Sequence, residues 1–267
     1  MKSNINLYLK TEYSLLSSLI RIDSLPKMLK ELGYSTCAIC DDQMYGAFKF
    51  YNVCVNNNIK PIIGLQVTFK HENFNSSLLL YAMNNIGYNN LLKISSLKNI
   101  KKDDFSIDDL SSLTFGVLCV IPSFENEVIK YYLNKSIDKA ISVLNSYKFL
   151  FKNLYLGIDL QRELSHKKIK EFKLFGDKNN IKCVAINKTC YYDDEDIKVY
   201  KALKSISLNT KKYDLQEEEY KMSFLSSNEM DLLFVGNEDL LGNLQEINDL
   251  CNVHLNFEGY KLPKYDI

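Results

Sequence analysis

Two adjacent aspartates stand where either a cation site or a helix cap could form. Asp41 and Asp42 follow the apolar run 36–40 and precede a segment whose apolar residues have helical spacing. Carboxylate oxygens are preferred ligands of hard divalent cations, but two carboxylates from one loop make a poor cage, so at most one weakly held ion is expected. Aspartate is also a favoured helix N-cap. The sequence alone leaves both interpretations open.

The cysteines and histidines are not spaced as a metal or redox site requires. Cys37 and Cys40 form a Cys-x-x-Cys pair, but side chains at i and i+3 of a strand point to opposite faces, and no second pair with zinc-like spacing exists. The three histidines, His71, His166 and His254, are far apart in the sequence. We expect core packing for the cysteines and assign the histidines no function.

The composition disfavours several classes of protein. The chain has 267 residues, of which 46% are hydrophobic, enough for one large domain. Lys+Arg and Asp+Glu are equal at 33 each, so the positive excess that drives nonspecific phosphate binding is missing. Arg21 and Arg162 are the only arginines, which disfavours sequence-specific reading of DNA.

Cysteine usage and the length of the apolar runs bear on the compartment. The seven cysteines form an odd set without the dense spacing of a disulfide framework, which predicts a reducing cytoplasm. The longest apolar stretches, such as 113–121, fall short of the roughly 20 residues that cross a bilayer. We therefore expect no membrane span and no membrane partner.

Short β-rich runs alternate with helical patterns along most of the chain. The seven runs predicted as strands are Ile5–Lys10, Thr36–Cys40, Pro61–Phe69, Ser77–Met83, Phe115–Ile121, Leu154–Asp159 and Lys182–Asn187. This alternation predicts an α/β fold of seven β/α units with parallel strands, in an open doubly wound sheet or a closed barrel. No glycine-rich loop follows a predicted strand, which disfavours a nucleotide-binding Rossmann unit.

Two features stand out near the C-terminus. Residues 209–223 are polar and charged, which predicts a surface excursion. Leu240, Leu244 and Ile247 share a stripe of a helix that Asn237 could cap. We expect this helix to pack on the outside of the sheet or barrel.

Several short motifs resemble those of one known family, and they follow one another in the same order. They are Asn6–Leu16, which ends in Thr-Glu-Tyr-Ser-Leu-Leu, then Ala38–Ala47, Ile59–Gly64, Gly87–Ser96, and Cys251–Leu255 before Leu262–Tyr265. Together they are similar to the N-terminal PHP (polymerase and histidinol phosphatase) domain of bacterial DNA polymerase III alpha subunits. The motifs follow one another without a large insertion, which resembles the DnaE type.

The resemblance covers essentially the whole chain and implies its fold and domain organisation. It implies an α/β fold, the distorted seven-stranded (β/α)7 barrel of PHP type. Residues 1–267 would form a single PHP domain, with 209–223 as the surface excursion. Residues 262–267 would begin the connector to a polymerase module that lies beyond this sequence.

The resemblance also marks where a metal site would lie. Active PHP domains hydrolyse phosphoesters with divalent ions that histidines and carboxylates hold at the C-terminal ends of barrel strands. The corresponding positions here are Asn6, Tyr8, Lys10, Asp41, Asp42, Gln66, Ser123, Lys188 and Cys190. Nearly every strong ligand is gone, and the ammonium groups of Lys10 and Lys188 would repel a cation. We expect a degenerate metal pocket without metal, other cofactor or catalytic residue.

The two lysines suggest how the remaining carboxylates are neutralised. An unpaired buried charge costs several kcal/mol or forces a pKa shift, whereas a hydrogen-bonded pair is tolerable. We hypothesise that Lys10 or Lys188 pairs with Asp41 or Asp42 in place of the missing ions.

These features favour a noncatalytic PHP domain within a DNA-directed DNA polymerase. By resemblance, it would stabilise the polymerase module and dock a proofreading exonuclease, and DNA contact would come through the full-length subunit. The main alternative is a metal-dependent PHP phosphoesterase or ancillary 3′–5′ exonuclease that uses unrecognised ligands. A third is an interaction module outside any polymerase.

Overall fold

The computed structural model describes residues 5–72, 74–160, 166–211 and 221–256. Its strands are β1 (Ile5–Leu9), β2 (Thr36–Asp41), β3 (Lys60–His71), β4 (Phe74–Ala82), β5 (Val117–Pro122), β6 (Asn153–Asp159), β7 (Lys182–Ile186) and β8 (Lys188–Thr189). Its α-helices are α1 (Leu25–Glu31), α2 (Ala47–Asn56), α3 (Asn85–Lys101), α4 (Glu127–Leu133), α5 (Ile137–Leu150), α6 (His166–Lys178), α7 (Ile197–Ser207), α8 (Ser227–Leu233) and α9 (Glu238–Leu250). Short 3-10 helices lie at Ile22–Ser24, Lys102–Asp104, Ile107–Leu110 and Asp194–Asp196.

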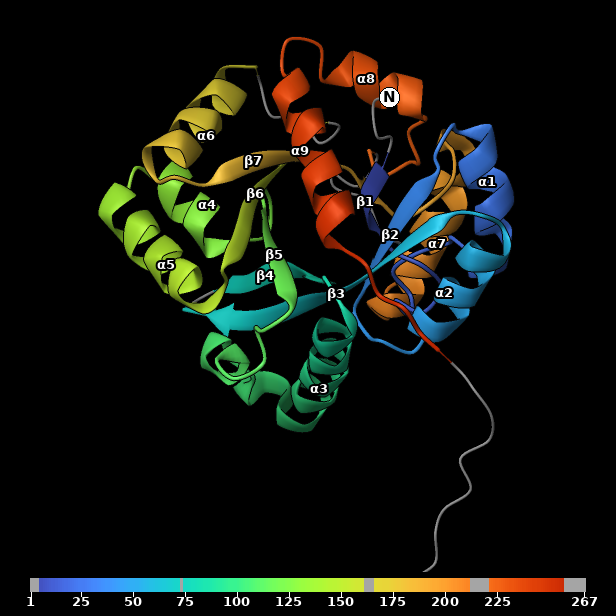
Figure 1. Ribbon diagram of the computed structural model, residues 1–267, viewed down its shortest axis with the longest axis horizontal. Helices are drawn as coiled ribbons and strands as arrows, with labels where there is room; N and C mark the ends of the chain where they lie inside the picture. Colours follow the sequence, from blue (N-terminus) through green and yellow to red (C-terminus); the bar gives the residue numbers. More distant parts are fainter. Residues whose placement is uncertain (1–4, 73, 161–165, 212–220, 257–267) are drawn as a thin grey trace, which may run out of the picture.

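The strands form a nearly closed barrel with helices around it (Figure 1). One sheet runs in the order β7-β6-β5-β4-β3-β2-β1-β8. Only Asn187 separates β7 from β8, so the two outermost strands of this sheet are consecutive in the chain. Because β7 pairs with β6 while β8 pairs with β1, this segment completes the ring. The predicted α/β barrel is confirmed, with eight strands, or seven if β7 and β8 count as one kinked strand.

All seven predicted strand segments are strands, but their pairing differs from the prediction at one place. β4 is antiparallel to both β3 and β5, so the expectation of seven β/α units with parallel strands is wrong here. β3 ends at His71 and β4 begins at Phe74, and a parallel crossover needs about a dozen residues or more. The connection is too short for anything but an antiparallel pair.

Strands of the barrel bury apolar residues on both of their faces. Every residue of β2 and β5 is buried, as expected for strands that are covered by helices on one side and by the barrel interior on the other. Tyr81 of β4 lies inside and donates a hydrogen bond from its hydroxyl to the carbonyl oxygen of Leu7 in β1, 2.6 Å away. Gly64 leaves room for this ring, since a Cβ there would come within 2.6 Å of it.

Helix α9 crosses the end of the barrel where the strands begin. Its Leu240, Leu244 and Ile247 are buried, and its Asn243 side chain donates to the carbonyl oxygen of Cys183 near the start of β7, at 2.6 Å. Lys60 at the start of β3 reaches the other end of the same helix. The predicted helix is confirmed, but it covers the end of the barrel and not its outer wall, because its apolar stripe fits the ring of strand starts.

Two predicted segments fall partly or wholly outside the described residues. The middle of the predicted surface excursion, 212–220, and the predicted connector 262–267 are not described. Met222, near the end of the excursion, is buried with Tyr191 and Tyr200 in a small second core.

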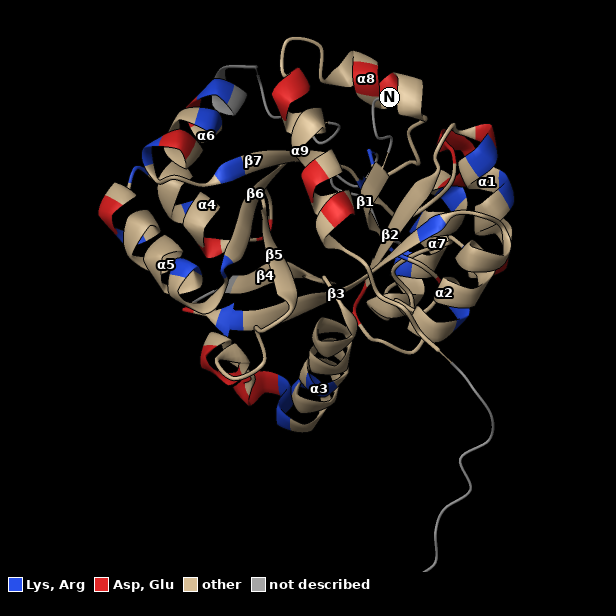
Figure 2. Ribbon diagram, in the orientation of Figure 1, with Lys and Arg blue, Asp and Glu red and all other residues tan. Residues whose placement is uncertain are grey.

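Among the described helices, none is long and apolar enough to span a membrane. Basic and acidic residues occur together on helices such as α1, α5 and α6 (Figure 2).

The same substitution at two helical glycines should have opposite effects on stability. A Cβ on Gly87 of α3 would lie 1.9 Å from the carbonyl oxygen of Gly116, whereas one on Gly242 of α9 meets no atom within 4 Å. We expect Gly87→Ala to lower the free energy of unfolding by about 2 kcal/mol or more through overpacking. Gly242→Ala should raise it by about 0.5–1 kcal/mol through helix propensity. Urea denaturation of both variants tests this, and equal effects would contradict the packing described.

Candidate functional site

The candidate site lies at the end of the barrel where β1 and β2 finish. Lys10 follows β1 directly, Asp41 is the last residue of β2, and Asp42 comes next. Asn6 and Tyr8 lie within β1, and together with Lys10 they are 1%, 2% and 5% exposed. Because neighbouring strands enclose β1, these polar side chains must find partners inside the barrel.

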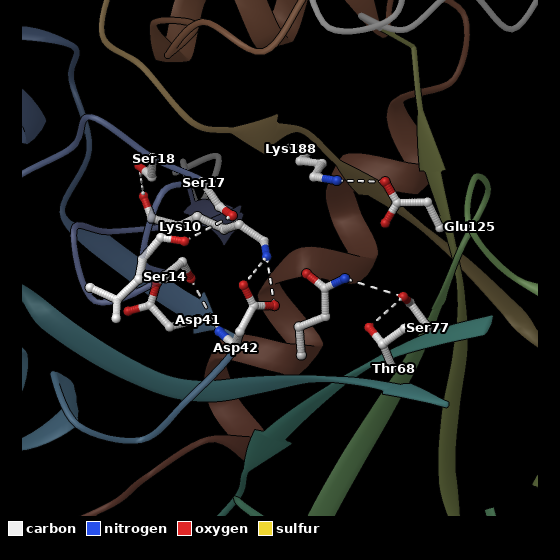
Figure 3. A network of polar contacts seen from close by, with 12 residues as sticks. Lys10, Ser14, Ser17, Ser18, Asp41, Asp42, Thr68, Ser77, Glu125 and Lys188 are labelled. Atoms are coloured by element: carbon white, nitrogen blue, oxygen red, sulfur yellow. Dashed lines mark hydrogen bonds and ion pairs between the residues drawn. The ribbon is translucent and has the colours of Figure 1, made fainter. Parts of the chain in front are cut away.

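Lys10 and Asp42 form an ion pair at the centre of the site (Figure 3). Lys10 Nζ donates to both carboxylate oxygens of Asp42, at 2.7 and 2.8 Å. Burial alone would raise the pKa of Asp42, but the charge and hydrogen bonds of Lys10, with smaller effects of Lys98 and Lys188, hold it below its usual value. Burial also acts to lower the pKa of Lys10, and Asp42 outweighs it, so that pKa is raised. Both groups are therefore charged at neutral pH.

The hypothesised lysine–aspartate pair is thus confirmed for one combination. Lys10 pairs with Asp42, while Lys188 pairs with Glu125 from the loop after β5, with 2.5 Å between Nζ and Oε1. Lys188 Nζ also lies 5.6 Å from the centre of the Tyr8 ring. Two separate ion pairs therefore cross the mouth of the barrel.

Asp41 is stabilised by hydrogen bonds from neutral donors. It is fully buried and accepts from the backbone N–H of Thr11 at 2.7 Å, the hydroxyl of Thr11 at 2.6 Å and the hydroxyl of Ser14 at 2.7 Å. Burial raises the pKa of this carboxyl, and the three donors only partly offset the rise. Thr11 and Ser14 belong to the Thr-Glu-Tyr-Ser motif, so the sequence held a signal for these partners that was not used.

The helix-cap interpretation of the two aspartates is wrong. Helix α2 begins at Ala47, its N-cap residue is Gly46, and no side-chain hydrogen bond caps it. Asp41 and Asp42 instead bind the loop that follows β1. They tie two neighbouring strand ends together.

Gln66 and Tyr8 extend the polar network along β3. Tyr8 donates from its hydroxyl to Gln66 Oε1 at 2.9 Å, and Gln66 Nε2 donates to the hydroxyl of Ser77 at 3.2 Å. The Ser77 hydroxyl lies 3.0 Å from that of Thr68. Burial is the main cause that raises the pKa of Tyr8, so the phenol stays protonated and keeps donating.

Lys98 of α3 is a site residue that sequence reasoning missed. Its Nζ donates to the carbonyl oxygen of Asp42 at 2.7 Å and to that of Gln66 at 3.3 Å. Burial lowers the pKa of this ammonium, and the charge of Asp42 only partly restores it. Nothing in the sequence singles out Lys98 among the lysines of its helix.

A second missed residue is Asp159, at the end of β6. It is buried, accepts from the backbone N–H of Lys188 through Oδ2 at 3.2 Å, and donates its own N–H to the hydroxyl of Ser123 at 3.1 Å. Ser123 therefore joins the ends of β5 and β6. Asp159 ended a predicted strand, which was the available signal.

Asn6 and Cys190 form hydrogen bonds where the barrel closes between β1 and β8. Asn6 Nδ2 donates to the hydroxyl of Thr189 in β8 at 2.9 Å. The carbonyl oxygen of Cys190 accepts from the Ser18 hydroxyl at 2.9 Å and from the N–H of Leu19 at 2.8 Å. Cys190 thus contributes its backbone, and its position serves packing between the β1 loop and β8.

A pocket of about 170 Å³ opens beside the two lysines. Its lining is mostly polar and combines residues from the β1 loop, β8 and α7, namely Lys10, Ser17, Glu125, Lys188, Cys190, Tyr200, Lys204 and Met222.

The residues at this site do not fit a cluster of divalent cations. Ammonium groups carry no free lone pair and repel cations, and Lys10 already occupies both carboxylate oxygens of Asp42. In the described part of the chain, no three or more His, Cys, Asp or Glu side chains come together in a group that could hold a metal ion.

The Cys-x-x-Cys pair does not have the features of a redox or metal site. Cys37 and Cys40 are fully buried and free, and burial is the main cause that raises the pKa of both thiols, to about 12 for Cys40. This is the opposite of an activated thiol. His71 contacts the Tyr131 hydroxyl at 3.1 Å, and the side chain of His166 falls outside the described residues.

The sequence model of the PHP domain matches residues 6–163 of this chain. The chain belongs to the PHP domain family. It is 27% identical to a protein named DNA polymerase III subunit alpha from Halalkalibacterium halodurans and 30% identical to one of that name from Buchnera aphidicola, in each case over 98% of this chain. The structure of an amidohydrolase from Chromobacterium violaceum is matched with a TM-score of 0.48 at 10% identity, over 86% of this chain and 96% of the other.

The relatives are much longer than this PHP domain. In each comparison the aligned region spans 98% of this chain but 24% of the alpha subunit. The relation therefore concerns about a quarter of those proteins, and it extends beyond residue 163 to nearly the whole chain.

Loss of the Asp42 charge should destabilise the PHP domain in a pH-dependent way. Asp42→Asn leaves the Lys10 ammonium buried without its partner, which we expect to cost about 2 kcal/mol at pH 7, below the cost of a fully buried pair because 35% of the Asp42 side chain is exposed. The lowered pKa means that the stabilisation is complete above the unfolded value of about 4 and is lost as the pH falls further. Urea denaturation from pH 7 downward measures this difference.

Asp23→Asn provides the matched control. Asp23 pairs with Lys49 at 2.6 Å, but the two side chains are 57% and 37% exposed, so its loss should cost about 0.5 kcal/mol or less. Equal costs for the two variants, or a cost of Asp42→Asn that persists unchanged at pH 3, would contradict the role assigned to the buried pair.

Proposed function

We propose that this chain is the N-terminal PHP domain of a bacterial replicative DNA polymerase III alpha subunit, and that it acts there as a noncatalytic scaffold. The observation that carries the scaffold role is the ion pair of Lys10 with Asp42. An ammonium group sits on the carboxylate that a catalytic metal would need. The alpha-subunit relatives, matched over 98% of this chain, support the polymerase assignment.

The scaffold role rests on how the barrel mouth is stabilised. Lys10 with Asp42, Lys188 with Glu125, and the donors around Asp41 join the segments after β1, β2 and β5 and strand β8. A fixed network of this kind stiffens one end of the barrel, while α9 covers the other. A rigid barrel would brace the polymerase module of the same subunit and offer a docking site for a proofreading exonuclease.

DNA would be contacted through the other parts of the subunit. This chain has as many acidic as basic residues, 33 of each, and its lysines at the barrel mouth are engaged with carboxylates and carbonyls. The electrostatic basis for strong binding to phosphates is therefore weak. We place this PHP domain in the cytoplasm with the rest of the replication machinery.

The purified chain should contain no stoichiometric divalent metal and should not hydrolyse phosphoesters. Elemental analysis, and assays on p-nitrophenyl phosphate and on 3′ ends of single-stranded DNA with manganese or zinc, measure the two properties. Treatment with EDTA should leave the melting temperature unchanged, since no bound ion contributes to folding. Stoichiometric metal, with an activity that Asp41→Ala abolishes, would instead establish the PHP phosphoesterase or exonuclease.

The reading frame after Ile267 tests the polymerase assignment separately. A frame that continues into a polymerase module supports it. A stop codon soon after this position would favour a freestanding interaction module.

A further inference from the structure

Glu127 is a buried carboxylate that takes no part in the ion pairs of the barrel mouth. It is the first residue of α4, and only 1% of its side chain is exposed. Its Oε1 accepts a hydrogen bond from the hydroxyl of Tyr147 in α5, and Nδ1 of His71, the last residue of β3, lies 4.0 Å from the same oxygen. In the described part of the chain, Glu127 Oε2 is buried without a hydrogen-bond partner.

The surroundings of Glu127 do not balance a full negative charge unless a proton is present. A carboxylate removed from water needs an opposite charge or several hydrogen-bond donors. Burial raises the pKa of the Glu127 carboxyl, and the hydrogen bond from Tyr147, a backbone N–H and the charge of His71 only partly offset the rise. When His71 and Glu127 both lack a proton, the buried charge is left unbalanced. One proton on either residue corrects this.

Protons can reach the cluster through His71, whose side chain is 30% exposed. Its Nε2 lies 3.1 Å from the hydroxyl of Tyr131 in α4. Next to it, Lys139 of α5 has its Nζ 5.4 Å from the centre of the Tyr131 ring and 3.9 Å from a carboxylate oxygen of Glu72. Glu72 and Lys139 thus balance each other's charge at the edge of the cluster.

The hydroxyls and the thiol of this cluster keep their protons near neutral pH. Burial is the main cause that raises the pKa of Tyr147, and that of Cys119, which lies close to Tyr147 in β5. Burial, with a smaller effect of Glu72, raises the pKa of Tyr131 to about 12. A proton gained or lost inside the cluster therefore belongs to the imidazole or to the buried carboxyl.

We infer that His71, Glu127 and Tyr147 form a proton-dependent latch, which holds the end of β3 against α4 and α5 and loosens when the proton shared by His71 and Glu127 is lost. The start of α4 is fixed to the same place, because the N–H of Glu127 donates to the Ser76 hydroxyl in β4 at 3.2 Å. The segment before α4 also carries Glu125, which pairs with Lys188 at the barrel mouth. The inference uses contacts within this chain alone and is independent of the polymerase assignment.

The first test compares the melting temperatures of the whole chain and of Glu127→Gln from about pH 4 to about pH 8. Because the folded pKa of Glu127 is raised, its stabilisation is present below the unfolded value of about 4.3 and is lost as the pH rises through the folded value. The melting temperature of the unmodified chain should therefore fall by about 3 °C relative to that of Glu127→Gln over this range. A constant difference, or a rise, would overturn the inference.

Glu72→Gln is the matched control. It removes a neighbouring carboxylate whose side chain is 54% exposed, so its melting temperature should follow that of the unmodified chain at every pH in the range. A pH-dependent difference as large as that of Glu127→Gln would place the effect in the charge of the surface and not in the latch.

A carbon NMR titration follows Glu127 directly and needs no change to the chain. Its carboxyl carbon should titrate above the usual range of exposed glutamates. In His71→Gln the titration should move to still higher pH, because the imidazole charge no longer favours the carboxylate. An ordinary midpoint, or a midpoint that His71→Gln leaves unchanged, would show that the two residues share no proton.

Amide hydrogen exchange tests whether the contact loosens. At pH 8 the amides of α4 and α5 should exchange about fivefold faster in the unmodified chain than in Glu127→Gln, whereas at pH 5 the ratio should be much closer to one. The comparison is made at equal pH, so the intrinsic dependence of exchange on pH cancels. The same ratio at both pH values would mean that the proton does not control the packing of these helices, and the latch would be ruled out.

Discussion

The arrangement at the barrel mouth follows from one electrostatic constraint, that a carboxylate removed from water needs an opposite charge or hydrogen-bond donors in place of the lost water. Asp41 and Asp42 are adjacent in sequence and solve this problem in different ways. Asp41 takes three neutral donors from Thr11 and Ser14, whereas Asp42 takes a full positive charge from Lys10. Their pKa values consequently move in opposite directions. Both solutions use the segment that follows β1, so the two strand ends are held to one another.

Closure of the barrel adds a second set of contacts to these partners. β8 lies beside β1, with Tyr8 opposite Lys188 in the pairing, although about 180 residues separate them in the chain. On its other side Lys188 follows β7 closely, so its ammonium reaches Glu125 and its backbone N–H reaches Asp159. The closure also packs Cys190 against the loop after β1. An open doubly wound sheet would leave Cys190 and the loop after β1 at opposite edges.

This chain balances carboxylates at the mouth of its PHP barrel with charged side chains. A barrel whose mouth is stabilised by metal ions depends on the supply of those ions, because binding energy contributes to folding. In this chain the balancing charges are covalently attached and come from three elements, with Lys10 after β1, Lys98 in α3 and Lys188 in β8. Stability at the mouth then depends on pH through Asp42. A domain of this kind can act as a rigid part of a larger assembly.

The sequence by itself determined the strand segments, the family and the absence of histidines and most carboxylates at the expected ligand positions, because apolar runs and residue types are local properties. It also narrowed the pairing of Lys10 to two candidates, Asp41 and Asp42. Tertiary structure decided which pair forms, since Lys10 and Asp42 meet only where β1 and β2 end side by side. It alone revealed Lys98, which is one of several lysines on α3 and reaches the site because that helix packs against β3 and β4. The direction of β4 and the position of α9 were likewise decided by packing. Apolar periodicity indicates which face of an element is buried, but not which other element covers that face.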